Sequence, residues 1–327
     1  MRHFTTEVGE NGASLTAYIA DSSNEMSTAA RRPAILIFPG GGYAFCSDRE
    51  AEPIALAYLA QGFNAFVLRY TVGMGDEIFN KAFADAQAAI AAVRANAADW
   101  QVSERLGLIG FSAGGHLAAS LATRGPDRPD ALLLGYAVTL ETTIGRGVPY
   151  PDTTPNVDAS TPPTFLFHTR TDIVVPPRHA LQFATALDQA GVPYELHVFA
   201  DGPHGLSLSN PMVANGAARM VQPRFGEWLE LSVSWLRTLW GDFATTSGRP
   251  TFDPADYADL PVSQRPIGAL KADHDLWASV LEVLPGLAKM YDEHEALAGL
   301  SVERLAQFTP DAVPEGAVEQ LEWLPQG

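Results

Sequence analysis

The chain has 327 residues, of which 46% are hydrophobic and 18% are charged, a composition typical of a folded globular protein. This length accommodates one large α/β domain and a smaller appendage. The formal net charge of −17 argues against nucleic acid as a partner and offers no attraction to an anionic membrane surface.

The predicted elements alternate between strands and helices through the first two thirds of the chain. Alternating polarity predicts a β-hairpin from residues 3–8 and 14–20, and the apolar run 33–38 is typical of a strand buried on both faces. The pattern then predicts strands at 64–70, 106–109, 131–138, 164–168 and 194–199, and helices at 51–61, 79–98, 113–123 and 177–190. This alternation favours a mostly parallel sheet with helices on both faces.

A change of composition after Trp240 predicts a domain boundary. A helix at 225–240 closes the first domain, 1–240, and its tryptophans are interpreted as packing on the sheet, with a ligand platform as the alternative. Residues 241–267 are proline-rich and predict a linker. Residues 268–327 predict a small acidic helical module, in which 268–308 form two or three short helices, broken near Pro285 and restarted at Ser301 as an N-cap. Homo-oligomerisation through this module is one hypothesis for its role.

Residues 110–114 (GFSAG) fit the pattern G-x-S-x-G between a predicted strand and a predicted helix. In this context the sharp turn lifts the serine hydroxyl clear of the sheet, and the flanking glycines let strand and helix approach closely. We therefore predict Ser112 as a nucleophile. His116 is four residues further on, but a position within the helix favours a structural, hydrogen-bonded histidine over a catalytic base.

Acyl transfer at Ser112 needs N–H donors for the oxyanion that develops on the substrate. Residues 39–43 (PGGGY) follow a predicted strand and provide a turn without side chains, so Gly41 and Gly42, with the backbone N–H of Ala113, are the predicted donors. An ordinary glycine turn is the alternative, and a phosphate-binding loop is disfavoured because no G-x-x-x-x-G-K-[ST] follows. Tyr43 either contacts substrate or packs, and Cys46 is interpreted as a small packing residue rather than a nucleophile.

The expected chain order of the remaining groups is serine, acid, histidine. His204 lies in the loop after the last predicted strand and is the predicted base. Asp172 follows the strand 164–168 and is the predicted acid, which would fix the tautomer of His204. Asp201 is the rival acid, but it is on the same loop as the histidine. The other histidines lie in or beside predicted elements or in the acidic tail: His3, His116, His168, His179, His197, His274 and His294.

Four segments in this order carry a family resemblance: PGGGYAF…SDRE, GFSAGGHLAA, FLFHTRTDIVVP and GPHGLSLS. They resemble the bacterial acetylesterase and acetyl-xylan-esterase-like branch of the α/β-hydrolases, which is related to the hormone-sensitive-lipase-like carboxylesterases. The resemblance covers about residues 1–240 and implies the α/β-hydrolase fold and the triad Ser112, Asp172 and His204. Pro39 departs from the lipase-type H-G-G-G motif, as in the PGGGY subgroup. Members are often esterases for short acyl groups on sugars or small alcohols.

These features predict a serine carboxylesterase that hydrolyses short-chain acyl esters through an acyl-enzyme, with acetylated sugars or xylo-oligosaccharides as substrates. An amide-bond hydrolase of peptidase or arylformamidase type with the same triad is the alternative, and a non-catalytic binding protein would predict a lost triad member. Residues 139–162 and 205–224 should line or cover the pocket.

No cofactor is expected for this chemistry, and no H-E-x-x-H or calcium-loop spacing indicates a metal site. The expected partner is a small-molecule or oligosaccharide ester, without nucleic acid or membrane. Because the sequence shows neither a signal-peptide core nor a membrane-spanning run, a cytoplasmic location is expected.

Overall fold

The computed structural model describes residues 1–142, 147–243 and 252–324. The chain divides into two compact units, the first made of residues 1–21 and 31–242 and the second of residues 22–30 and those from 243 onward. Parts of three predicted segments lie outside the described residues: 143–146 of the pocket segment, 244–251 of the linker and 325–327 of the C-terminal module.

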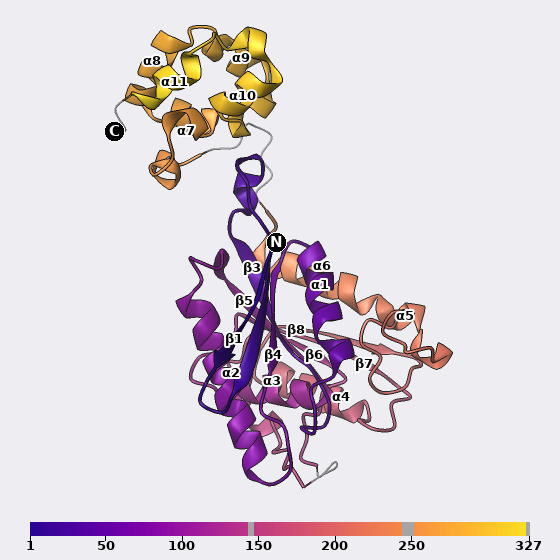
Figure 1. Cartoon of the computed structure of the whole chain (residues 1–327). Coiled ribbons are helices and arrows are strands. Elements are labelled where there is room, and N and C mark those ends of the chain that lie inside the picture. The colour runs from indigo at the N-terminus through magenta and orange to yellow at the C-terminus, as the bar shows by residue number, and fades with distance from the viewer. Residues whose placement is uncertain (143–146, 244–251, 325–327) are drawn as a thin grey trace. The chain divides into compact units, whose positions relative to one another are not determined.

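The first unit is built on one eight-stranded sheet in the order β1-β2-β4-β3-β5-β6-β7-β8 (Figure 1). The hairpin of β1 and β2 pairs antiparallel and joins β4 antiparallel, whereas every later pairing is parallel. The strands are β1 (Arg2–Val8), β2 (Ala13–Ile19), β3 (Arg32–Phe38), β4 (Asn64–Arg69), β5 (Val102–Phe111), β6 (Ala131–Gly135), β7 (Thr164–Thr169) and β8 (Tyr194–Phe199). The predicted mostly parallel sheet is confirmed.

Helices cover both faces of this sheet because its central strands are apolar on both sides. In β3, Leu36 points into a core shared with α2 (Glu77–Ala95), α3 (Ser112–Arg124) and α4 (Arg178–Gln189). Its neighbour Ile37 points to the opposite core, shared with α1 (Glu52–Ala60) and α6 (Trp228–Trp240). The period-two alternation of a strand thus supplies two hydrophobic layers from one sequence.

The tryptophans of α6 pack on the sheet rather than form a ligand platform. Trp228 is fully buried, its ring stacks on Phe167 at 4.3 Å, and its Nε1 donates a hydrogen bond of 2.9 Å to Ser207 O. Trp235 packs on Phe165 with a centroid distance of 5.7 Å. A short helix, α5 (Pro223–Gly226), precedes α6.

Strand β6 ends three residues earlier than the sequence predicts, at Gly135. The reason is Tyr136, whose φ of 36° lies in the left-handed region and turns the chain out of the sheet. Val138, which the sequence assigns to the strand, donates its backbone N–H to Ser112 O at 3.1 Å instead. The early end brings this segment to the carboxyl edge of the sheet, beside the predicted nucleophile.

The second unit has its own hydrophobic core and is helical, as predicted. Its helices are α7 (Ile267–Ala272), α8 (His274–Val283), α9 (Leu287–Glu293), α10 (Val302–Phe308) and α11 (Ala317–Glu322). The four helices that end by residue 308 exceed the two or three expected there, since Asp273 caps α8 and so separates it from α7. The predicted N-cap is confirmed, since the Ser301 side chain accepts the Arg304 N–H at 3.3 Å.

Residues 22–30 group with this second unit, although the sequence places them in the first domain. They form a 3₁₀ segment, η1 (Asn24–Ala29), with no buried side chain, and Glu25 pairs with Arg304 at 3.1 Å. Within the residues that the structure describes, no helix is both long enough and apolar enough to cross a membrane.

Candidate active site

Ser112 stands at the junction of β5 and α3 with a φ of 52°, a strained conformation for a residue with a side chain. The flanking glycines make this turn possible. A Cβ on Gly110 would lie 2.3 Å from Gly114 O, and one on Gly114 would lie 2.1 Å from Phe38 O. Any larger residue at either position would push helix and strand apart, so the turn that presents the hydroxyl requires both glycines.

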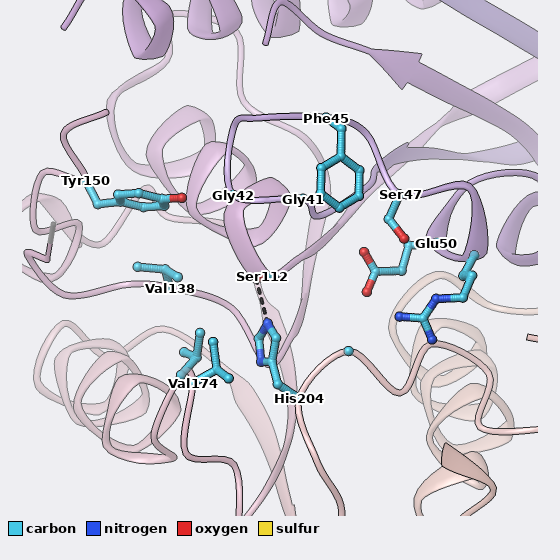
Figure 2. Close-up of a pocket in the computed structure, with 13 residues that line it drawn as sticks. Gly41, Gly42, Phe45, Ser47, Glu50, Ser112, Val138, Tyr150, Val174 and His204 are labelled. Carbon is cyan, nitrogen blue, oxygen red and sulfur yellow. Dashed lines mark hydrogen bonds between the residues drawn. The ribbon is translucent and has the colours of Figure 1, made fainter. Parts of the chain in front are cut away.

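The structure brings Ser112, His204 and Asp172 together from three separate loops. Ser112 Oγ lies 2.8 Å from His204 Nε2, drawn as a dashed line in Figure 2, and His204 Nδ1 lies 2.7 Å from Asp172 Oδ2. A carboxylate oxygen can only accept, so the proton is on Nδ1 and Nε2 is left to accept the serine O–H. This is the tautomer that a general base needs.

Asp172 is held as an ionised, oriented carboxylate. Its Oδ1 accepts the backbone N–H groups of Val174 and Val175, both at 2.9 Å. Burial raises the pKa of this carboxyl, but the hydrogen bond and charge attraction of His204 and the Val175 N–H outweigh it, so the pKa is lowered overall. The rival acid, Asp201, is exposed, and the structure pairs His204 with Asp172 instead.

The loops that carry the acid and the base are tied together by hydrogen bonds at Gly202. Thr169 Oγ1 donates to Gly202 O at 2.7 Å, and Gly202 N donates to Thr171 Oγ1 at 2.9 Å. Gly202 has a φ of 146°, and a Cβ there would lie 2.6 Å from the Leu206 side chain. The approach of the two loops is therefore set by backbone geometry as well as by the His204–Asp172 bond.

The glycine turn presents unused N–H groups beside Ser112. Gly41 and Gly42 have φ values of 127° and 65°, and Gly41 O accepts from the N–H groups of Ala44 and Phe45. Among the residues that the structure describes, none accepts a hydrogen bond from the N–H of Gly41 or Gly42. The N–H of Ala113 is in the first turn of α3, where no intrahelical acceptor exists. These three N–H groups are available to an oxyanion.

We expect Gly41→Ala to lower kcat about 100-fold or more, the magnitude of losing an oxyanion donor. A Cβ at Gly41 would lie 2.0 Å from Phe45 O, which is backbone, so the turn must open and its N–H groups must move. Steady-state kinetics with p-nitrophenyl acetate measures the loss. Gly12→Ala is the matched control, because Gly12 also has a positive φ, 77°, but open space around it. Activity of Gly41→Ala within threefold of wild type would contradict the assignment.

Tyr43 lies beneath the turn and does not line the pocket, so of the two interpretations, substrate contact and packing, the structure favours packing. It is fully buried, and its O–H donates to His116 Nδ1 at 2.9 Å. His116 Nε2 in turn donates to Pro151 O at 2.9 Å, so the ring is neutral with both nitrogens engaged. Burial is the main cause that lowers the pKa of His116 to about 4. The φ of 57° at Tyr43 directs its side chain into the core beneath the glycine turn, and residue type alone does not indicate this backbone conformation.

Acidification should destabilise the first unit through His116, whose pKa in the fold is about 4 against an ordinary 6.5. Between about pH 6.5 and pH 4, His116 binds a proton in the unfolded chain but not in the folded one. The free energy of unfolding therefore falls as the pH drops through this range. The slope from this group approaches about 1.4 kcal/mol per pH unit. Thermal denaturation between pH 7 and 4 measures it, and a non-titrating His116→Gln variant should give a shallower dependence. Equal slopes for the two proteins would contradict this.

A cavity of about 280 Å³ opens over Ser112 and has two different walls. Figure 2 shows Tyr150, Val138 and Val174 on one side of the Ser112–His204 pair, and Phe45, Ser47 and Glu50 on the other. Val175, Arg49 and Gly205 complete the lining with the two turn glycines. Tyr150 and Gly205 come from the segments that the sequence predicts to line the pocket.

The sequence does not predict the wall formed by residues 45–50, in which Ser47, Arg49 and Glu50 are polar and Phe45 is apolar. The SDRE segment, which carries part of the family resemblance, is its only signal in the sequence, and residue order alone does not place these side chains beside Ser112. Within the described residues, no cluster of three or more His, Cys, Asp or Glu side chains is arranged to hold a metal ion.

Two family descriptions match parts of the chain. Residues 22–146 match the family described as BD-FAE, and residues 148–222 match the prolyl oligopeptidase family. The first range contains Ser112 and the glycine turn, and the second contains Asp172 and His204.

Two curated proteins are similar to part of the chain. The endo-1,4-beta-xylanase B of Butyrivibrio fibrisolvens is 31% identical over 217 residues, which cover 57% of this chain and 34% of that protein. An acetylxylan esterase of Xylanibacter ruminicola is 29% identical over 199 residues, which cover 54% of this chain and 41% of that protein. The chain thus spans well under half the length of either relative.

Solved structures match a larger share of the chain. MGS-M1, an alpha/beta hydrolase enzyme from a Medee basin deep-sea metagenome library, is 44% identical with a TM-score of 0.67, covering 72% of this chain and 98% of that one. An acetyl ester-xyloside bifunctional hydrolase from Caldicellulosiruptor lactoaceticus is 32% identical with a TM-score of 0.59, covering 71% of this chain and 90% of that one. The carboxylesterase Cest-2923 from Lactobacillus plantarum is 27% identical with a TM-score of 0.67, covering 75% and 100%.

Proposed function

The chain belongs to the α/β-hydrolase family, and from this premise we propose that it is a serine carboxylesterase for short acyl esters, with acetylated sugars or xylo-oligosaccharides as substrates. The observation that carries the proposal is the hydrogen-bonded chain from Ser112 through His204 to Asp172, with distances of 2.8 and 2.7 Å. Free N–H donors beside the serine complete the set of groups that acyl transfer needs.

In this mechanism, Ser112 Oγ attacks the carbonyl carbon of the ester while its proton passes to His204 Nε2. The N–H groups of Gly41, Gly42 and Ala113 bind the oxyanion of the tetrahedral intermediate. The carbon–oxygen bond to the alcohol breaks, and His204 returns the proton to the leaving oxygen. Water then attacks the acyl-enzyme with His204 again as the base, which releases the acid and restores Ser112. Asp172 stabilises the imidazolium throughout.

The two walls of the pocket support the choice of substrate class. Val138, Val174 and Tyr150 give an apolar surface suited to a short acyl chain, in a cavity of about 280 Å³. Opposite them, Ser47 and Arg49 offer hydrogen-bond donors to a hydroxylated alcohol. The similarity to an acetylxylan esterase and to an acetyl ester-xyloside hydrolase points to the same class.

A p-nitrophenyl ester series from acetate to octanoate, followed by acetic acid release from acetylated xylo-oligosaccharides, tests the proposal. We expect kcat/KM to be highest for acetate and to fall by about tenfold or more at octanoate, because about 1 kcal/mol for each of only two badly accommodated methylenes already exceeds a factor of ten. Wild-type protein that leaves all these esters untouched would contradict the proposal.

An amide-bond hydrolase with the same three groups is the second candidate. The observation in its favour is the match of residues 148–222, which contain Asp172 and His204, to the prolyl oligopeptidase family. The matched pair of p-nitrophenyl acetate and p-nitroacetanilide distinguishes the two, since both carry the same acyl group. Faster cleavage of the anilide would favour the amide-bond hydrolase.

A further inference from the structure

Glu50 is a buried carboxylate in the wall of the pocket that the mechanism above does not use. It is 3% exposed, and among the described residues no Lys or Arg side chain forms an ion pair with it. Burying a carboxylate without a countercharge is costly unless hydrogen bonds hold it. Figure 2 shows its carboxylate directed toward the Ser112–His204 pair.

One oxygen of Glu50 holds the start of the glycine turn. Oε2 accepts the backbone N–H of Gly40 at 2.8 Å, and Gly40 directly precedes the predicted oxyanion donors Gly41 and Gly42. The packing here is tight, because a Cβ on Gly40 would lie 2.7 Å from this oxygen and 3.0 Å from Ser112 Cβ. A shift of the Glu50 side chain would therefore shift the turn relative to the serine.

The other oxygen of Glu50 holds the surroundings of the base. Oε1 accepts the O–H of Tyr136 at 2.6 Å, and the same hydroxyl oxygen accepts the N–H of Ser207 at 3.0 Å. Ser207 follows His204 on the same loop, and its hydroxyl donates to the backbone oxygen of Arg49, next to Glu50. The ring of Tyr136 packs edge-on against the ring of His204 with a centroid distance of 5.1 Å.

We propose that Glu50 is a positioning residue that fixes the oxyanion turn and the His204 loop in their places on either side of Ser112. This inference rests on the proposed function. Its two oxygens reach the two halves of the catalytic machinery, through Gly40 on one side and through Tyr136 on the other. A carboxylate suits this position because both groups that it must hold are donors. Glu50 thus acts through the N–H donors and the base rather than on the substrate.

The test compares Glu50→Leu and Glu50→Gln with wild type. We expect Glu50→Leu to lower kcat about 100-fold with KM changed less than threefold, since misplacement of catalytic groups by about 1 Å has such an effect. Glu50→Gln keeps a carbonyl oxygen for the Gly40 N–H and should lose about tenfold, a partial rescue. Glu52→Gln is the matched control, because Glu52 is an exposed glutamate two residues away, and it should leave kcat unchanged.

Tyr136→Phe supplies an independent variant in case Glu50→Leu does not fold. It keeps the ring on His204 but removes the hydroxyl that links Glu50 to the loop, and we expect about a tenfold loss of kcat. Both single variants break the same hydrogen bond, the one between Glu50 and Tyr136. The double variant Glu50→Gln/Tyr136→Phe should therefore lose less kcat than the product of the two single losses. Losses that multiply, in folded protein, would mean that the two residues act independently and would overturn the proposal.

A second readout does not depend on ester turnover. A fluorophosphonate probe bonds to the Ser112 oxygen with loss of fluoride while His204 takes the proton, and its phosphoryl oxygen occupies the oxyanion site. We expect the second-order labelling rate to fall in parallel with kcat across the variants, measured at a temperature at which each variant remains folded. Labelling and kcat within twofold of wild type in folded Glu50→Leu, or in both other variants, would overturn the proposal. If the probe labels wild-type protein but that protein hydrolyses no ester, only the proposed function is contradicted. The labelling rates of the variants would still decide the role of Glu50.

Discussion

Replacing Asp172 by Asn should lower kcat for p-nitrophenyl acetate by about 10³ to 10⁴-fold, with KM changed only a few-fold. The structure gives a specific reason. One oxygen of Asp172 accepts the N–H groups of Val174 and Val175, so an asparagine must turn its carbonyl toward them. Its NH₂ group then faces His204 Nδ1 and donates to it. The proton of the histidine is driven to Nε2, which can no longer accept the proton of Ser112.

The matched control for this change is Asp201→Asn. Asp201 is exposed and lies three residues before His204 on the same loop. In the structure, however, His204 is hydrogen-bonded to Asp172. We expect Asp201→Asn to keep kcat within about twofold, as an exposed substitution outside the site should. A large loss in Asp201→Asn with little loss in Asp172→Asn would exchange the roles of the two carboxylates and contradict the assignment.

Ser112→Ala should remove at least about 10⁵-fold of kcat, because the variant lacks the oxygen that forms the acyl-enzyme. The variant keeps a Cβ at the strained φ of 52°, so its melting temperature should remain close to that of wild type. The competing nucleophile is Cys46. Burial is the main cause that raises the pKa of its thiol to about 11, so it stays protonated and unreactive at neutral pH. Cys46→Ala should therefore retain full activity. Activity that survives in Ser112→Ala but not in Cys46→Ala would place the nucleophile on the cysteine.

The parts of this protein that sequence predicts well are those with local physical causes. The buried strand of residues 33–38 shows itself as an apolar run, and the turn at Ser112 shows itself as glycines two residues on either side. The positions of Asp172 and His204 follow from chain order, because the carboxyl ends of neighbouring parallel strands meet at one edge of the sheet. These expectations needed no knowledge of distant contacts, and the structure brings all three side chains together.

What the sequence leaves open depends on distant contacts and on backbone conformation. Glu50 and Tyr136 are 86 residues apart, and nothing in either neighbourhood indicates that they share a hydrogen bond. Tyr43 stands next to the oxyanion glycines, but its positive φ sends the ring beneath the turn. The tyrosine that does line the pocket is Tyr150. It lies in a segment that the sequence assigns to the pocket without identifying the residue. Side chains of the wall are set by tertiary packing, so residue type alone does not identify them.

The two units differ in the same way. In the first unit, the strand and helix patterns locate nearly every element within a few residues of its observed bounds. In the second unit, capping residues such as Asp273 divide what looks like a longer helical stretch into short pieces. The contribution of residues 22–30 to that unit rests on contacts such as Glu25 with Arg304, 279 positions away in the chain. No pattern within ten residues of either side chain carries that information.

The central claim is that Ser112 is the nucleophile, and the most direct measurement locates the bond that it forms. Wild-type protein is labelled with a fluorophosphonate probe, digested, and analysed by tandem mass spectrometry, with a His204→Ala variant labelled in parallel. The account predicts one modified residue, Ser112, and labelling at least about 100-fold slower without His204 as the base. A label on any other residue, or labelling that does not depend on His204, would contradict it.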